Sequence, residues 1–185
     1  MRRGTAATHE AISRFLSRVL RHEPQTIGLS LDAQGWARID ELVERARAHG
    51  MHLTRDLVVD VAETSAKQHF ACDGAGRIRA NHGHTVPIDL GIEPSEPPVI
   101  LFHGTATTSV AAIRAEGLVP GRRRYVHLSA DAVTATSVGQ RHGLPVVLRV
   151  AAGRMWAAGF KFVCSTSGVW LTNAVPAEFI QFPWR

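Results

Sequence analysis

Residues 70–80 read FACDGAGRIRA, and this stretch predicts a β-hairpin. Two short segments suited to strands, residues 70–72 and 77–80, flank a turn at 73–76 whose aspartate and glycines favour a tight reversal of the chain. Three helical patterns precede the hairpin, and three helices followed by a two-stranded wing are typical of a winged helix. Modules of this kind usually touch nucleic acid, although some serve only as scaffolds. We therefore predict a winged-helix lobe over residues 1–86.

The first predicted helix covers residues 8–22. Its apolar residues recur at spacings of three and four, so that they share one face of the helix. They are Ile12, Phe15, Leu16, Val19 and Leu20. Pro24 stops the helix, so Arg21 and His22 lie in its last turn. A basic pair there is explained by the negative end of the helix dipole, and spacing alone favours this explanation over a functional one.

The second half of the chain has a different pattern. Four prolines predict that residues 87–98 are an interdomain linker. Residues 99–185 combine several short strand patterns with two helical ones, which predicts an α+β domain. A buried strand at 99–102 is expected to end in the turn at 103–105, where glycine permits close approach of a ligand. A second strand is expected at 125–129, directly after three arginines.

The basic composition of the chain has two explanations. The 185-residue chain carries a formal charge of +5, and all but two of its 21 basic residues are arginines. This surplus fits a polyanionic partner or phosphate ligands, but an arginine-rich proteome with solvated surface charges explains it equally well. Cys72 and Cys164 are too few for a disulfide framework or a cysteine-rich zinc site. Without a signal-peptide or membrane-span pattern, we expect a cytoplasmic, monomeric protein.

The reactive side chains are arginines and histidines rather than paired carboxylates. The candidates are Arg21, His22, His69, His103, Arg123 and His127. Such a set is suited to holding phosphates and stabilising negative charge in a transition state, because guanidinium groups bind phosphate through two hydrogen bonds. The chain contains no P-loop, no G-x-G-x-x-G and no Ser-His-Asp order. His82 and His84 have an H-x-H spacing, but no neighbouring ligands complete a metal site, so none is predicted.

Five motifs together resemble the tRNA/RNA 2′-phosphotransferase family. They are LRH at 20–22, ANHGHT at 80–85, FHGT at 102–105, YVHLS at 125–129 and SGVWLT at 167–172. The likeness extends from about Ser13 to Ile180, with the motifs in the family's order. It implies a winged-helix lobe followed by an ADP-ribosyltransferase-like lobe, a role in tRNA processing, NAD⁺ as co-substrate and no metal.

The resemblance also implies a two-step reaction. An RNA 2′-phosphate attacks the anomeric carbon of the nicotinamide ribose of NAD⁺ and expels nicotinamide. The ribose 2″-hydroxyl then attacks that phosphate. The products are RNA with a free 2′-hydroxyl and ADP-ribose 1″,2″-cyclic phosphate. Both steps place charge on phosphate oxygens, which suits the arginines and histidines of this chain.

The family's catalytic set is Arg-His-Arg-Arg. Arg21 and His22 match its first two members, which overrides the helix-dipole explanation, and Arg123 matches the last. The third position holds His69, in the segment KQHF, where the family has arginine. We assign the nucleotide pocket to His103, Gly104, Thr105, His127 and Ser129, and the RNA phosphate also to Lys67, Asn81 and His84.

Other functions stay open beside this reaction, and His69 is the reason for the first of them. Histidine need not be charged at pH 7 and lacks the two-pronged hydrogen bonding of arginine, so the second step is expected to suffer more than the first. The protein would then act as a nucleic-acid ADP-ribosyltransferase, for example on terminal phosphates. An alternative of another class is a non-catalytic nucleic-acid-binding protein. ADP-ribosylation of protein side chains fits less well, because no glutamate stands at a matching strand to orient the acceptor.

Overall fold

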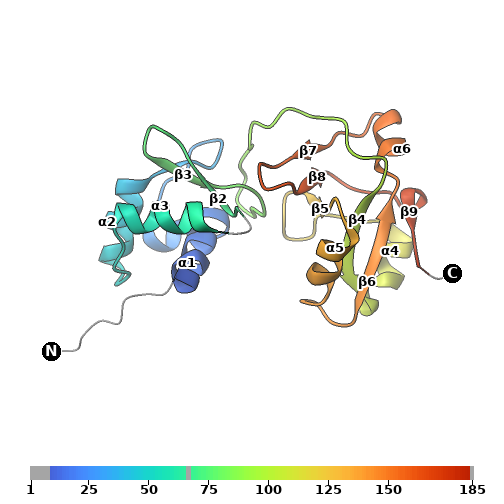
Figure 1. The fold of residues 1–185 in the computed structure, drawn as a ribbon, viewed down its shortest axis with the longest axis horizontal. Helices are drawn as coiled ribbons and strands as arrows, with labels where there is room; N and C mark the ends of the chain where they lie inside the picture. Colours follow the sequence, from blue (N-terminus) through green and yellow to red (C-terminus); the bar gives the residue numbers. More distant parts are fainter. Residues whose placement is uncertain (1–8, 66–67, 184–185) are drawn as a thin grey trace. The chain divides into compact units, whose positions relative to one another are not determined.

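The computed structural model describes residues 9–65 and 68–183, and the chain forms two compact units, Met1–Gly91 and Ile92–Arg185 (Figure 1). Both units contain helices and small antiparallel sheets. This confirms the predicted α+β class.

The first unit has the predicted helices and hairpin. Its elements are α1 (His9–Arg21), a 3₁₀ turn (Pro24–Ile27), β1 (Ala37–Arg38), α2 (Ile39–Ala48), α3 (Arg55–Thr64), β2 (Phe70–Cys72) and β3 (Arg77–Ala80). Strands β2 and β3 pair antiparallel, with Phe70 opposite Ala80, and β1 joins the other edge of β3 to make a three-stranded sheet. The apolar face of α1 is buried against the core.

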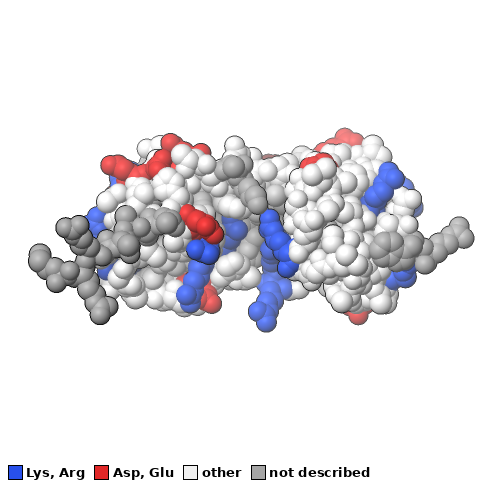
Figure 2. Space-filling view, turned by 60° about the horizontal axis from the view of Figure 1, so that its bottom comes forward, with Lys and Arg blue, Asp and Glu red and all other residues white. Residues whose placement is uncertain are grey.

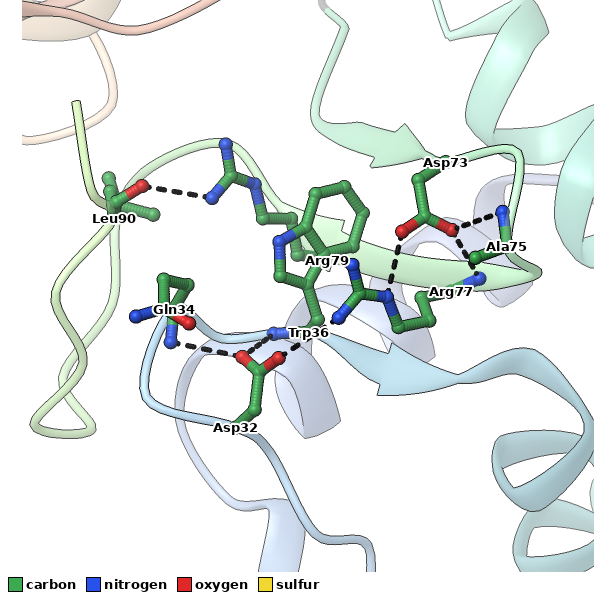
Figure 3. A network of polar contacts seen from close by, with 8 residues as sticks. All are labelled: Asp32, Gln34, Trp36, Asp73, Ala75, Arg77, Arg79 and Leu90. Atoms are coloured by element: carbon green, nitrogen blue, oxygen red, sulfur yellow. Dashed lines mark hydrogen bonds and ion pairs between the residues drawn. The ribbon is translucent and has the colours of Figure 1, made fainter.

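A single carboxylate stabilises the hairpin turn. One oxygen of Asp73 accepts hydrogen bonds from the backbone amides of Ala75 and Arg77, at 3.0 and 2.9 Å, and the other oxygen lies 2.7 Å from Nε of Arg77. The bond from the Arg77 amide is the main reason why the pKa of Asp73 is lowered. Asp32 closes the same network from the loop before β1, with Arg77 and Arg79 lying over the ring of Trp36 (Figure 3).

The first residues of the predicted linker pack against the first unit. Nη1 of Arg79 donates to the carbonyl of Leu90 at 3.0 Å, and the Asp89 amide donates to the Ala33 carbonyl at 2.9 Å. Ile88 and Leu90 are buried. Farther along, the Ser95 amide bonds a carbonyl of the second unit. The prolines predict a linker over residues 87–98, and its first part is attached to the first unit by these hydrogen bonds and by the buried Ile88 and Leu90.

The second unit is built on two three-stranded antiparallel sheets. One has the order β4 (Leu101–Ala106), β6 (Pro145–Val150), β9 (Ile180–Gln181), and the other β5 (Val126–Leu128), β8 (Trp170–Thr172), β7 (Val163–Cys164). The helices are α4 (Val110–Glu116), α5 (Ala132–Gly139) and α6 (Ala152–Ala157), with 3₁₀ turns at Thr107–Ser109 and Ala177–Phe179. Two hydrogen bonds between Phe102 and Ser129 join the sheets.

Two predictions for this unit were wrong. The strand expected to end at residue 102 runs on as β4 to Ala106, because every residue from Leu101 to Ala106 pairs with β6. Residues 103–105 therefore lie in a strand rather than in a turn. Helix α6, with six residues, was not predicted, since so short a segment cannot show a helical repeat.

Two glycines allow α5 to lie directly on β4. A Cβ atom at Gly104 would stand 1.7 Å from the carbonyl oxygen of Ala135, and one at Gly139 would stand 2.7 Å from the carbonyl oxygen of Thr105. Both separations are far shorter than van der Waals contact. Gly104 is thus required for packing of a helix on the strand.

Candidate active site

In the first unit, the end of α1 is tied to the segment at residues 81–86. The carbonyl of Arg21 accepts hydrogen bonds from the amides of Thr85 and Val86, at 2.9 and 3.3 Å. Nδ1 of His22 lies 3.2 Å from Oγ1 of Thr85. Two motifs about 60 residues apart in sequence are therefore brought together, because amides at residues 85 and 86 satisfy a helix-end carbonyl.

The guanidinium of Arg21 reaches the residue at the third catalytic position. Its Nη2 donates to the carbonyl of His69 at 3.3 Å, and its central carbon lies 5.8 Å from the ring centroid of Phe70. The rings of His69 and His82 stand 6.2 Å apart, edge to face. Arg21, His22, His69 and His82 thus form one cluster of cationic and imidazole groups, half-buried or exposed.

The other predicted phosphate ligands of this unit lie differently. Asn81 and His84 are each only 4 % exposed. Nδ2 of Asn81 donates to the carbonyl of Gln68 at 2.6 Å, and Nε2 of His84 would lie 3.6 Å from a Cβ at Gly35. Both side chains therefore face the protein interior. Lys67 lies outside the described residues.

In the second unit, two histidines link the two sheets. His103, on β4, donates from Nδ1 to the backbone carbonyl of His127, on β5, at 3.0 Å. A carbonyl can only accept, so Nδ1 carries the proton, and in the neutral ring Nε2 is an acceptor. His127 donates likewise from Nδ1 to the carbonyl of Tyr125 at 2.9 Å.

His103 is held in its neutral form. Burial lowers its pKa; the bond to the His127 carbonyl opposes this effect, and the charges of His142 and Arg123 add to it. An acceptor nitrogen on a neutral ring suits a hydroxyl group of a ligand such as a ribose.

The remaining predicted nucleotide ligands divide into two kinds. Ser129 is half-buried and follows β5, next to the histidine pair. Thr105 is 7 % exposed, and its backbone lies against Gly139, while Gly104 is covered by Ala135. The structure thus brings together His103, His127 and Ser129, whereas Gly104 and Thr105 support helix packing.

The three arginines lie in the turn directly before β5, as predicted. Arg123 is exposed as a residue, yet partial desolvation, followed by the charge of Arg141, lowers the pKa of its guanidinium. Arg124 bonds the hydroxyl of Tyr125 at 3.2 Å. Among the described residues, no carboxylate lies within 4.0 Å of Arg122, Arg123, Arg124 or Arg141. These cations are available to an anionic ligand.

Arg141 and His142 are additions that the sequence alone did not assign. They lie in the turn after α5, where the amides of residues 141 and 142 bond the carbonyls of Val138 and Gly139. Packing of α5 on Gly104 brings this turn close enough to affect Arg123 and His103 electrostatically. No local pattern could reveal this, because the proximity depends on long-range packing.

Three further observations concern surface charge, metal ligands and membrane-spanning helices. On the part of each unit that Figure 2 shows, basic side chains stand at separate places rather than in one continuous band. Within residues 9–65 and 68–183, no group of three or more His, Cys, Asp or Glu side chains is arranged to hold a metal ion. Over the same residues, none of the helices has the length and apolar character needed to cross a membrane.

The lowered pKa of His103 predicts a pH-dependent stability. An unfolded histidine titrates near pH 6.5, so below that pH the unfolded chain binds more protons than the folded chain. The free energy of unfolding therefore rises with pH in this range, and the contribution of His103 is lost as the pH falls from about 7 toward 5. His103→Gln keeps a donor but removes the titration, and should show a shallower loss in denaturant unfolding. Exposed His52→Gln, which removes a histidine that does not act on His103, is the control. Identical pH slopes for wild type and His103→Gln would contradict the prediction.

Comparison with known proteins places the chain among transferases that act on RNA phosphates. It belongs to the RNA 2'-phosphotransferase, Tpt1 / KptA family, whose model matches residues 7–174. It is 53 % identical over 171 residues to a probable RNA 2'-phosphotransferase of Agrobacterium fabrum, covering 92 % of each chain. Similar proteins of the same name occur in Burkholderia lata (51 % identity, 92 % of this chain and 89 % of the relative) and Streptomyces coelicolor (48 %, 93 % and 94 %). The resemblance drawn from the five motifs is confirmed.

Proposed function

We propose that the protein transfers an RNA 2′-phosphate to NAD⁺, giving RNA with a 2′-hydroxyl, nicotinamide and ADP-ribose 1″,2″-cyclic phosphate. The observation that carries the NAD⁺ assignment is the His103–His127 pair beside Arg123 and Arg141. A neutral histidine with an acceptor nitrogen suits a ribose hydroxyl. The neighbouring arginines, which no carboxylate of the described residues approaches within 4.0 Å, suit phosphate groups. Ser129 adds a hydroxyl beside the same pair. When bound, NAD⁺ supplies the electrophilic carbon and the nicotinamide leaving group.

In this proposal the residues of the chain have separate roles. Arg123 holds the reacting phosphate and stabilises the charge on its oxygens in both steps. Arg21, His22 and His69 of the first unit bind substrate phosphate, with His22 fixed by Thr85 and Arg21 bonded to the His69 carbonyl. In the first step a phosphate oxygen forms the bond to carbon as the bond to nicotinamide breaks. In the second step the ribose hydroxyl loses its proton as its oxygen bonds phosphorus, and the RNA 2′-oxygen leaves and takes up a proton.

A product analysis tests the proposal directly. Incubation with NAD⁺ and a 2′-phosphorylated oligoribonucleotide should yield nicotinamide, dephosphorylated RNA and the cyclic phosphate. His69 is expected to slow the second step, so ADP-ribosylated RNA should accumulate transiently. His69→Arg should then raise the rate of that step about tenfold, because a permanently charged guanidinium that binds phosphate through two hydrogen bonds replaces an imidazole. Release of no nicotinamide would contradict the proposed function, and equal second-step rates would contradict the role given to His69.

His69 also supports a second candidate function. If the second step is very slow, the protein is a nucleic-acid ADP-ribosyltransferase that modifies terminal phosphates. Stable ADP-ribosylated product on a 5′- or 3′-phosphorylated oligonucleotide, at a rate exceeding that on the 2′-phosphorylated one, would favour this candidate.

For the architecture, we propose that the first unit is a winged-helix lobe that binds RNA and the second an ADP-ribosyltransferase-like lobe. The three helices with a β2–β3 wing support the first assignment, and the two linked antiparallel sheets support the second. We also propose a cytoplasmic monomer. The unpaired thiols of Cys72 and Cys164, whose pKa values are raised by burial, support a reducing compartment.

A further inference from the structure

A strained residue directly precedes His69. Gln68 has a φ of +42°, and it is the one non-glycine residue with positive φ in the part of the chain that the structure describes. Residues other than glycine rarely adopt this backbone conformation, because their Cβ atom crowds the backbone. Strain of this kind persists only where surrounding contacts impose it, and it is concentrated at functional sites.

Asn81 supplies the contacts that impose it. Its Nδ2 donates to the carbonyl of Gln68 at 2.6 Å, and its backbone amide donates to the carbonyl of His69 at 3.0 Å. Arg21 adds a bond to the same His69 carbonyl at 3.3 Å, and the Gln68 amide bonds the carbonyl of Ser65 at 2.8 Å. Within residues 9–65 and 68–183, the side chain of Asn81 is thus the one side chain bonded to the Gln68 carbonyl.

The side-chain amide of Asn81 forms a hydrogen bond through its nitrogen but not through its oxygen. The Gln68 carbonyl can only accept, so the nitrogen of Asn81 must face it. Oδ1 of Asn81 is then buried and has no hydrogen-bond partner among the described residues. A buried acceptor without a partner is costly, so an asparagine at this position is explained by what its nitrogen holds. The engaged nitrogen and 4 % exposure leave the side chain unable to contact RNA.

We propose that Asn81 is a positioning residue, which clamps Gln68 in the left-handed conformation and so directs His69 toward the reacting phosphate. This replaces the direct phosphate contact that the sequence suggested for Asn81. The inference rests on the proposed function through His69, but the clamp itself is a property of the folded chain.

The test combines Asn81 with Gln68. Asn81→Ala removes the clamp and keeps the backbone bond, so kcat for phosphate transfer should fall about tenfold or more, with little change in KM for RNA. Gln68→Gly alone should be close to wild type, since glycine adopts positive φ without strain. The double variant should recover at least about half of the lost activity on a logarithmic scale. A raised KM for RNA in Asn81→Ala without recovery in the double variant would overturn the proposal.

Two further measurements separate the possible failures. Gln68 is exposed, so Gln68→Val should fold even if Asn81→Ala does not, and it should lose activity because a β-branched residue disfavours positive φ. Equal activity of Gln68→Val and Gln68→Gly would overturn the clamp. The NMR shifts of the His69 ring report the clamp without any reaction: they should move in Asn81→Ala and return in the double variant. A wild-type protein without phosphotransfer activity would refute the proposed function while leaving this readout intact.

Discussion

Replacement of Gly104 by alanine is expected to destabilise the second unit by at least about 3 kcal/mol and to abolish activity. The added Cβ would stand 1.7 Å from the carbonyl oxygen of Ala135 and 2.6 Å from its carbonyl carbon. Both atoms belong to the backbone of α5, so no side-chain rotation can relieve the clash. The helix must move away from β4, which also shifts the turn carrying Arg141 and His142.

Denaturant unfolding followed by tryptophan fluorescence measures the effect. Gly74→Ala is the matched control, because Gly74 has no positive φ and a Cβ there would meet no atom within 4 Å. Its free energy of unfolding should stay within about 0.5 kcal/mol of wild type. A Gly104→Ala protein that unfolds at the wild-type denaturant concentration would show that α5 adapts, contrary to the packing described above.

The contrast between the two halves of the chain shows what local sequence can predict. The Asp73 turn and the apolar face of α1 are short-range patterns, and the structure has the hairpin and the helix where these patterns place them. Residues 103–105 suggested a ligand-binding turn because glycine usually marks one. Their strand conformation is set by pairing with β6 and by α5, about 40 and 30 residues farther along the chain.

The candidate site follows the same rule. The candidates Arg21, His22, His69, His103, Arg123 and His127 were predicted from residue type and motif, since their chemistry is visible in the sequence. Arg141 joins Arg123 only through helix packing, and the bond of Asn81 to Gln68 spans 13 residues and a hairpin. Residues that act by holding others carry no chemical signature of their own, so they are found only from contacts.

Replacement of Arg123 by glutamine is expected to lower kcat for phosphate transfer by about 100-fold or more, the usual effect of removing one group that stabilises transition-state charge. Arg123 is exposed, and no described carboxylate lies within 4.0 Å of it, so its removal should leave the free energy of unfolding nearly unchanged. Its backbone amide, which bonds the carbonyl of Pro120 at 3.1 Å, is kept in the variant. Single-turnover rates of nicotinamide release and of cyclic phosphate formation measure the two steps separately.

The neighbouring Arg122 provides the control. It lies in the same exposed turn and carries the same charge, so Arg122→Gln tests whether net positive charge alone explains the effect. We expect Arg122→Gln to retain activity within about threefold at moderate salt, because an exposed charge is largely screened. Comparable losses in the two variants would mean that the turn attracts RNA as a diffuse basic patch. A loss confined to Arg123→Gln, and unaffected by lower salt, would assign to this guanidinium a direct hold on the reacting phosphate.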